Sequence, residues 1–190
     1  REAARELKPA WMCGDAGQWH LGPRERGHML LLPPILVAKA VQPMADGITR
    51  LREETGLEVL PENPPGSAFV GDLHILDFFA RVLEAADTGM LLDCAHLAIY
   101  QRMMGHAPTT GLDAFPLDRV VEIHIAGGTE QHVHGLPWVE DDHGTEILPE
   151  TWEIVDHIAA HAPLTAHVAT SSHIAAHAHL TAHVHTWIIG

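Results

Sequence analysis

The segment Met90–His96, which reads M-L-L-D-C-A-H, constrains the fold more strongly than any other stretch of the chain. Its first three residues form a continuous apolar run, which is typical of a strand buried on both faces of a parallel sheet. Asp93 and His96 follow where such a strand would emerge into a loop. Because α/β barrels carry their active sites at this carboxyl end of the strands, the segment predicts a buried strand that delivers polar groups to a site.

Segments with strand character and segments with helix character alternate along the chain, with a period of about 30 residues. Apolar residues at helical spacing predict helices over residues 35–54, 72–86, 97–105 and 149–160. Short apolar runs predict strands over residues 9–15, 57–60, 90–92 and 119–125. Such alternation is typical of parallel strands that are joined by right-handed crossover helices.

The fold class that this alternation predicts is α/β and TIM-barrel-like. A closed eight-stranded barrel usually needs about 250 residues, whereas this chain has 190. We therefore expect a partial or incomplete (β/α)8 barrel with parallel strands and crossover helices, or else a smaller open sheet. Beyond the last predicted strand, residues 129–143 are expected to form a polar loop.

The C-terminal part of the chain breaks this rhythm, and eight of the 17 histidines lie beyond residue 156. The segment 157–168 recurs as 173–184 with one substitution, which makes a low-complexity repeat with a period of 16 residues. A helix would place histidines four apart on one face, where they could hold a metal ion. Such pairs are His157/His161, His173/His177 and His179/His183. A duplicated terminus whose histidines reflect composition is the favoured interpretation. We therefore divide the chain into a TIM-barrel-like metal-binding domain, 1–162, and a His/Ala-rich repeat tail, 163–190.

Charge and cysteine content argue against several classes of protein. The formal net charge of −14 disfavours a nucleic-acid-binding protein, since a phosphate backbone requires a concentrated basic surface. No apolar run is long enough to span a bilayer, and the N-terminal residues do not read as a signal peptide. Two cysteines, Cys13 and Cys94, give no disulfide framework, so a reduced, cytoplasmic setting is expected. The chain begins with Arg1 rather than Met, and we expect that further residues precede it.

Carboxylates and imidazoles follow the strand-like segments one after another. The candidate metal ligands are Asp15, Glu62, Asp93, His96, His124, Asp141 and His143. Unpaired carboxylates packed together would repel one another and raise one another's pKa, a cost that bound cations remove. Mixed oxygen and imidazole ligands suit zinc, manganese or iron better than magnesium or calcium. The size of the set predicts two or three ions, with Glu62 and Asp93 as bridging ligands and an activated water or oxygen species as the outcome.

Two branches of the xylose-isomerase-like TIM barrels share these motifs. The pattern resembles the apurinic endonucleases with three zinc ions, which carry a Glu, a D-x-x-H, a strand-end His and a D-x-H. Here these are Glu62, Asp93 with His96, His124, and Asp141 with His143. The flanking segments are more similar to the multinuclear non-heme iron-dependent oxidative enzymes. The matching segments are Glu62-Asn63, Leu91-Leu92-Asp93, Glu122–Gly127 (E-I-H-I-A-G) and Pro149-Glu150-Thr151-Trp152.

The second resemblance implies both a cofactor and an activity. Its members use two or three iron ions and dioxygen to modify cysteine residues of ribosomally made precursor peptides. A small partner protein often presents the peptide. By that resemblance the seven candidate residues would be direct metal ligands, with Glu62, Asp93 and His96 closest to the chemistry. The chain departs from the family at Asp15, where a His is usual, and at His96, where an Asn is common.

Two other functions are compatible with the same residues. Zinc or manganese at the strand ends would suit a TIM-barrel isomerase or hydrolase, of the sugar-isomerase or endonuclease type. The third hypothesis is not an enzyme: it is a degenerate, non-catalytic metal-binding barrel, or a barrel whose His-rich tail only sequesters metal. Neither a nucleic-acid partner nor a membrane is expected.

Overall fold

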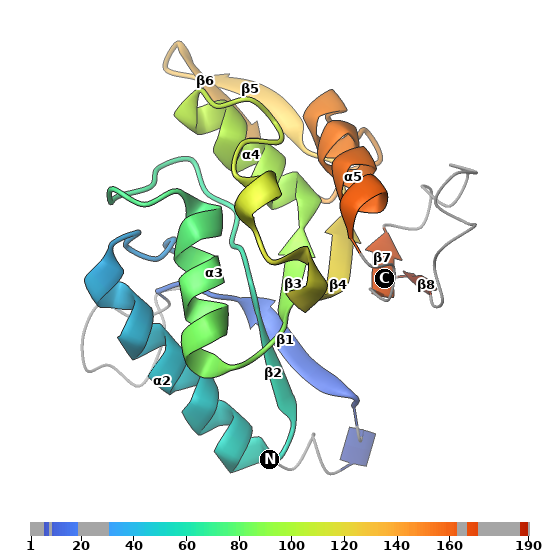
Figure 1. Ribbon diagram of the computed structural model, residues 1–190. Coiled ribbons are helices and arrows are strands. Elements are labelled where there is room, and N and C mark those ends of the chain that lie inside the picture. Colours follow the sequence, from blue (N-terminus) through green and yellow to red (C-terminus); the bar gives the residue numbers. More distant parts are fainter. Residues whose placement is uncertain (1–5, 8, 19–30, 163–166, 171–186, 190) are drawn as a thin grey trace.

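The structure, a computed structural model, describes residues 6–7, 9–18, 31–162, 167–170 and 187–189. In these residues the main feature is a six-stranded sheet with the order β1-β2-β3-β4-β7-β8, and every neighbouring pair is parallel (Figure 1). The strands are β1 Trp11–Asp15, β2 Glu58–Glu62, β3 Met90–Asp93, β4 Val120–Ile125, β7 His167–Thr170 and β8 Trp187–Ile189.

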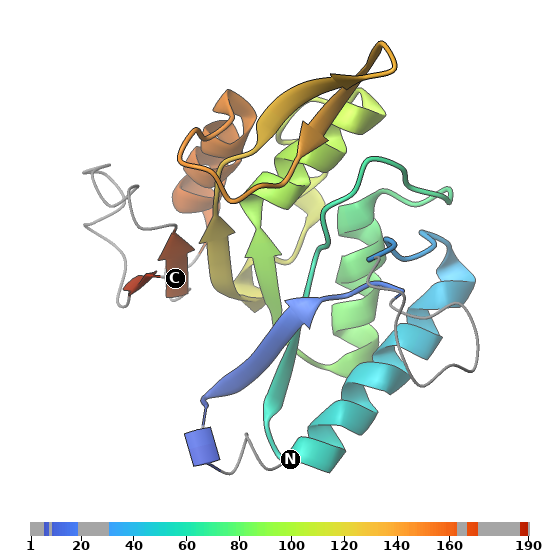
Figure 2. The same ribbon diagram turned by 180° about the vertical axis from the view of Figure 1, so that it is seen from behind.

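A helix lies in the sequence between each pair of successive strands of this sheet from β1 to β7. These helices are α2 Ala38–Thr55, α3 Ile75–Ala86, α4 Cys94–Met104 and α5 Pro149–His161, and the 3-10 turns η1 Leu112–Ala114 and η2 Leu117–Arg119 lead into β4. Figures 1 and 2 show the helices on one face of the sheet, while the opposite face is seen in Figure 2. The predicted α/β class is therefore confirmed, and the parallel sheet with its crossover helices is consistent with a partial TIM barrel.

Apolar side chains from one face of the strands pack against these helices and form the core. Met90 and Leu92 of β3 and Phe79 of α3 each expose 0% of their surface. Ile123 and Ile125 of β4 belong to the same cluster. The apolar run that opens the most informative segment of the sequence is therefore a buried central strand, as predicted.

The opposite face of the sheet carries polar side chains. Because side chains alternate along a strand, Asp93 points away from Leu92, and Glu122 and His124 point away from Ile123. In a barrel this is the inner face. The alternation therefore separates a helix-covered apolar side from a side that carries these polar groups together with the buried Leu91.

Helix α4 begins at Cys94, three residues earlier than predicted. The reason is the side chain of Asp93, which accepts a hydrogen bond from the backbone N–H of His96 at 2.8 Å and caps the helix. Helices α2 and α3 instead begin three residues later than predicted, at Ala38 and Ile75.

The polar loop that we expected over 129–143 is wrong in its first part. Strands β5 Thr129–Val133 and β6 Leu136–Glu140 form an antiparallel hairpin there. Its two-residue turn has positive φ at both central residues, 53° at His134 and 79° at Gly135, which is typical of a type I′ hairpin turn. In Figures 1 and 2 this hairpin extends beyond the ends toward which β3 and β4 point.

In the predicted repeat tail, the structure describes β7 and β8. Strand β7 pairs with β4, so this part of the tail continues the sheet. The division at residue 162 stays a prediction. On α5 the rings of His157 and His161 stack with centroids 4.3 Å apart, whereas the pairs within 173–183 lie outside the described residues. None of the described helices combines the length and the apolar character that crossing a bilayer requires.

A buried asparagine joins the ends of two strands. Asn63 directly follows β2 and exposes 0% of its surface. Its Nδ2 donates to the backbone oxygen of Asp93, and the backbone N–H of Asp93 donates to its Oδ1, both at 2.9 Å. One side chain therefore satisfies both backbone groups of Asp93.

Replacing Leu92 by Ala should lower the free energy of unfolding by about 2 to 5 kcal/mol, because a fully buried strand residue leaves a cavity. Urea unfolding followed by circular dichroism measures this. The matched control is Leu51→Ala on α2, where the side chain is 45% exposed and a change within about 0.5 kcal/mol is expected. Equal losses for the two variants would contradict the assigned core.

Replacing Asn63 by Ala should lower the free energy of unfolding by about 2 to 5 kcal/mol, because it leaves two buried backbone groups of Asp93 without partners. Chemical unfolding of the metal-free protein measures this effect. Gln42→Ala is the control, since it removes an exposed hydrogen bond to Asp46 on α2. A loss of unfolding free energy in Asn63→Ala no larger than in Gln42→Ala would show that the two hydrogen bonds between Asn63 and Asp93 contribute little to stability.

Candidate metal centre

The carboxyl ends of the first four strands supply the polar cluster. Asp15, Glu62 and Asp93 are the last residues of β1, β2 and β3, and His124 is the last but one of β4. The register places Asp15 opposite Glu62 and Asp93 opposite His124. Parallel pairing therefore brings together residues that are up to 109 positions apart in the sequence.

Asp15, Glu62 and His96 form the first ligand group. Each offers one ligand atom, and these atoms all lie within 4.8 Å of one another. The Nδ1 atom of His96 is 3.8 Å from Asp15 Oδ1 and 3.8 Å from Glu62 Oε1. His96 comes from the first turn of α4, so the strand-end carboxylates and the helix start converge on one point.

Glu62, Asp93 and His124 form the second ligand group, again with ligand atoms within 4.8 Å of one another. His124 Nδ1 lies 3.5 Å from Glu62 Oε1 and 3.8 Å from Asp93 Oδ2. Glu62 belongs to both groups, so its carboxylate is placed where it could bridge two ions. Asp93 Oδ2 also lies 3.7 Å from His96 Nε2, which ties the two groups together.

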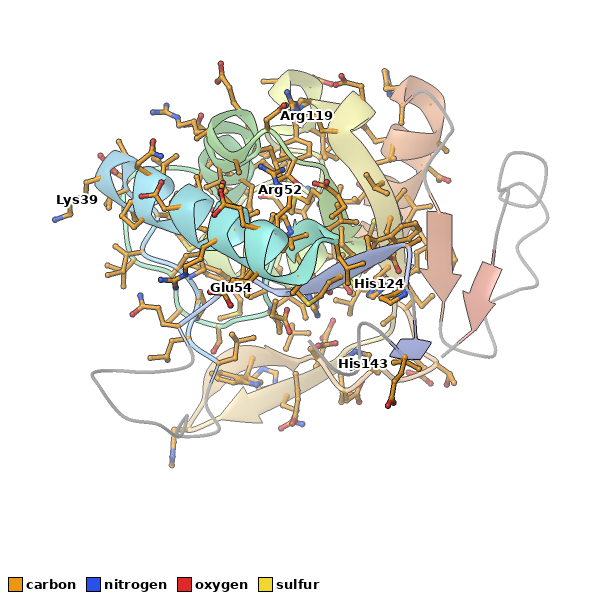
Figure 3. The ribbon with its side chains drawn as sticks, turned by 90° about the horizontal axis from the view of Figure 1, so that it is seen from below. Lys39, Arg52, Glu54, Arg119, His124 and His143 are labelled. Atoms are coloured by element: carbon orange, nitrogen blue, oxygen red, sulfur yellow. The ribbon has the colours of Figure 1, made fainter. Side chains whose placement is uncertain are left out.

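The hairpin adds Asp141, which directly follows β6. Its Oδ2 lies 2.9 Å from His96 Nε2, and its side chain is 10% exposed. His143 lies at the edge of the cluster: its side chain is 70% exposed, and its Nδ1 is 3.6 Å from Asp141 Oδ1. Figure 3 shows His124 and His143 on the side of the sheet opposite to helix α3. Six of the predicted ligands thus form one contact network, and His143 joins it at the solvent side.

The two central imidazoles are held in their charged form. Burial lowers the pKa of His96, but Asp93 and Asp141 outweigh it and raise that pKa to about 9. Burial likewise opposes the charged form of His124, yet hydrogen bonds with Glu122 and Glu62 raise its pKa to about 10. In the metal-free protein both rings are therefore protonated at neutral pH.

The carboxylates respond in different directions. Burial, followed by the charge of Glu62, raises the pKa of Asp15 to about 6. Burial also raises the pKa of Asp93, although His96 opposes the shift. For Asp141, burial acts upward, but the hydrogen bond with His96 outweighs it and lowers the pKa. Repulsion among neighbouring acids is thus relieved in part by protons and in part by imidazolium groups.

The donor atoms fit metal ions. Among the described residues, Asp15 Oδ1 and Asp141 Oδ1 are buried oxygens without a hydrogen-bond partner. A buried carboxylate oxygen in this state is costly unless a cation lies near it. Four carboxylates with two imidazoles form a donor set that suits iron, manganese or zinc. Asp15 Oδ1 lies 3.8 Å from His96 Nδ1, and Asp141 Oδ1 lies 3.6 Å from His143 Nδ1, so each of these two oxygens is close to a second possible metal ligand.

Two residues that contact the predicted ligands were not themselves predicted from the sequence as part of the site. Asn63 donates to and accepts from Asp93, and its backbone oxygen lies 2.9 Å from His96 Nδ1. Glu122, which exposes 5% of its surface, lies 3.1 Å from His124 Nε2 through its Oε1. Strand alternation could have found Glu122, because a residue two positions from His124 on a strand lies on the same face.

Comparison with known proteins places the chain in a family. The family model described as RiPP precursor modification enzyme MbnB/TglH/ChrH matches residues 4–186. A UPF0276 protein of Anaeromyxobacter sp. (strain Fw109-5) is 29% identical over 152 residues, which cover 78% of this chain and 51% of the relative. A UPF0276 protein of Acaryochloris marina is 34% identical over 113 residues, covering 58% and 40% respectively. The chain thus spans about half the length of the curated relatives it matches. Since the family model covers nearly all of it, the chain belongs to the MbnB/TglH/ChrH family of RiPP precursor modification enzymes.

Proposed function

We propose that this chain carries a two- or three-iron centre that uses dioxygen to modify cysteine residues of a ribosomally made precursor peptide. The observation that carries the proposal is the pair of ligand groups that share Glu62 at the ends of parallel strands. Family membership supports the substrate class. When bound, iron would supply the redox chemistry with dioxygen.

The ligands that we propose are the seven residues chosen from the sequence. They are Asp15, Glu62, Asp93, His96, His124, Asp141 and His143. Asp93 and His96 side chains are 2% and 4% exposed, so they would hold ions on the closed side of the centre. The side chains of His124 and Asp15 are 32% and 27% exposed, so a cysteine side chain of the peptide could approach the centre where these two residues lie.

A hollow beside the centre supports a peptide substrate. A cavity of about 430 Å³ is lined by Trp138 and Asp141 of the hairpin region and by Pro65 of the loop after β2. Trp138 is 39% exposed, and aromatic residues are enriched at the interfaces through which proteins bind their partners. We propose that the peptide lies along this cavity, so that its cysteine reaches the strand ends. Presentation by a small partner protein belongs to the same proposal.

The alternative function is a zinc- or manganese-dependent isomerase or hydrolase. The specific observation in its favour is His96, which completes a D-x-x-H motif and lies within the first ligand group. With redox-inert ions the same residues would orient a water or a hydroxyl group instead. Metal identity therefore separates the two proposals.

Anaerobically purified protein should contain more than one iron per chain by elemental analysis, and Asp93→Asn should lower that content at least about tenfold, because Asp93 contacts both imidazoles. With dioxygen, the iron-loaded protein should change the mass of a cysteine-containing precursor peptide, and Asp93→Asn should not. Asp77→Asn, at an exposed pair with Arg81 on α3, is the matched control and should behave as the parent.

Zinc without iron would sink the oxidative proposal and favour the alternative. A further variant tests the non-catalytic reading: His173, His177, His179 and His183 are replaced together by Gln. If all bound metal is lost with these tail residues while Asp93→Asn retains it, the strand-end centre is wrong.

Metal binding should release protons. At pH 7 the rings of His96 and His124 are protonated in the metal-free protein, since their pKa values are about 9 and about 10, whereas a metal ligand must be neutral. Each imidazole that binds should therefore release about one proton, and apparent metal affinity should fall as the pH is lowered. Calorimetric titration with Zn²⁺ in two buffers of different ionisation heat measures the number of protons released.

His124→Gln should release about one proton fewer than the parent. The control is His106→Gln, because His106 lies beside Gln101 on a different part of the surface. Proton release that is the same in His124→Gln as in the parent would contradict this assignment.

A further inference from the structure

A buried carboxylate connects two strands that are not neighbours in the sheet. Glu122 on β4 accepts a hydrogen bond from Trp11 Nε1 on β1 through Oε2, at 2.6 Å. Its other oxygen, Oε1, lies 3.1 Å from His124 Nε2. Strands β2 and β3 lie between β1 and β4 in the sheet order, so this contact spans the polar face of the sheet.

The contact fixes which nitrogen of His124 faces the ligand group. Nε2 points to Glu122, whereas Nδ1 lies 3.5 Å from Glu62 Oε1 and 3.8 Å from Asp93 Oδ2. A histidine that donates one ring N–H to a carboxylate has its other nitrogen free to bind a metal ion. The hydrogen bond thus fixes the ring orientation and, once Nδ1 gives up its proton to a metal ion, keeps the remaining proton on Nε2.

The geometry also explains why a carboxylate is kept in this buried place. Glu122 is 5% exposed, and burying a charge is costly unless hydrogen bonds and opposite charges surround it. Trp11 supplies a donor to one oxygen, and the His124 ring supplies a donor to the other. A neutral apolar residue at position 122 would fill the space but would leave the His124 ring without its anchor.

We propose that Glu122 and Trp11 are positioning residues, which hold His124 so that it binds metal through Nδ1. This inference rests on the proposed metal centre, but it goes beyond it by naming the coordinating atom and the residues that select it. Glu122 acts on the ion only through His124. Trp11 acts one step further away, by holding the carboxylate of Glu122.

The coordinating atom can be tested directly. Nitrogen-15-labelled protein is loaded with ¹¹³Cd²⁺, and the scalar coupling between cadmium and each ring nitrogen of His124 is recorded by NMR. Coupling to Nδ1 is expected, with Nε2 still protonated. Coupling to Nε2, or direct binding of cadmium by Glu122 with His124 uncoupled, would overturn the inference. His124→Gln identifies the signal, because it removes it.

Variants test the positioning role. Cadmium affinity should fall about 10- to 100-fold in Glu122→Ala, as is usual when a carboxylate partner of a metal-binding histidine is removed. Glu122→Gln should lose less, since its amide oxygen can still accept from His124 Nε2, and it guards against misfolding of the Ala variant. Trp11→Phe should lose less than tenfold, because it keeps the ring but removes the N–H donor.

The cadmium affinity of the double variant at Glu122 and Trp11 distinguishes a positioning role from a general packing role, since loss of packing alone would not be recovered by a second substitution. In Glu122→Gln the amide NH2 would meet the Trp11 N–H, two donors face to face, so adding Trp11→Phe should recover part of the lost affinity. Glu150→Ala, which breaks an ion pair with Arg102 away from the centre, is the control and should bind cadmium as the parent does. Circular dichroism confirms that each variant is folded.

The outcomes separate this inference from the proposed function. If the parent binds no cadmium at the strand ends, the metal centre itself fails. If the parent binds cadmium through His124 but Glu122→Ala binds it within twofold of the parent, only the positioning role fails.

Discussion

Asp93 is the position on which the rest of the site depends, because three different interactions meet there. Its backbone N–H and C=O both form hydrogen bonds with the side chain of Asn63, which hold the end of β3 against the end of β2. Its side chain accepts from the backbone N–H of His96 and starts helix α4. The same carboxylate faces both imidazoles, with Oδ2 at 3.7 Å from His96 Nε2 and 3.8 Å from His124 Nδ1. Strand end, helix start and ligand geometry are therefore one structural unit.

Crowded acids are tolerated here because the fold supplies compensating charge. Burial disfavours the charged forms of Asp15 and Asp93, and raises the pKa of each. In the metal-free protein, the positive charges of protonated His96 and His124 offset part of the repulsion among the neighbouring carboxylates. Bound cations would take over the same role, with oxygens such as Asp15 Oδ1 already in place. The arrangement that makes the metal-free site costly is thus the arrangement that would make metal binding favourable.

Sequence patterns identified much of this architecture. The apolar run at 90–92 predicted the central strand, and the strand ends predicted the residues that converge in space. The β5–β6 hairpin was missed, because β5 is mainly polar and Pro137 interrupts β6, although the His134-Gly135 turn was a usable signal. His143 was predicted as a ligand on the same grounds as Asp141. In the structure its side chain is 70% exposed, whereas that of Asp141 is 10% exposed, and this difference depends on the path of the chain after the hairpin.

By itself, the sequence determined the α/β class and the set of acids and imidazoles at the strand ends, because periodicity and strand ends are local properties. The tertiary structure decided the rest. Parallel pairing set the register that places Asp93 opposite His124, and a contact between Trp11 and Glu122, 111 residues apart, turned the His124 ring. Such choices depend on distances between segments remote in sequence, and a local pattern carries no information about them.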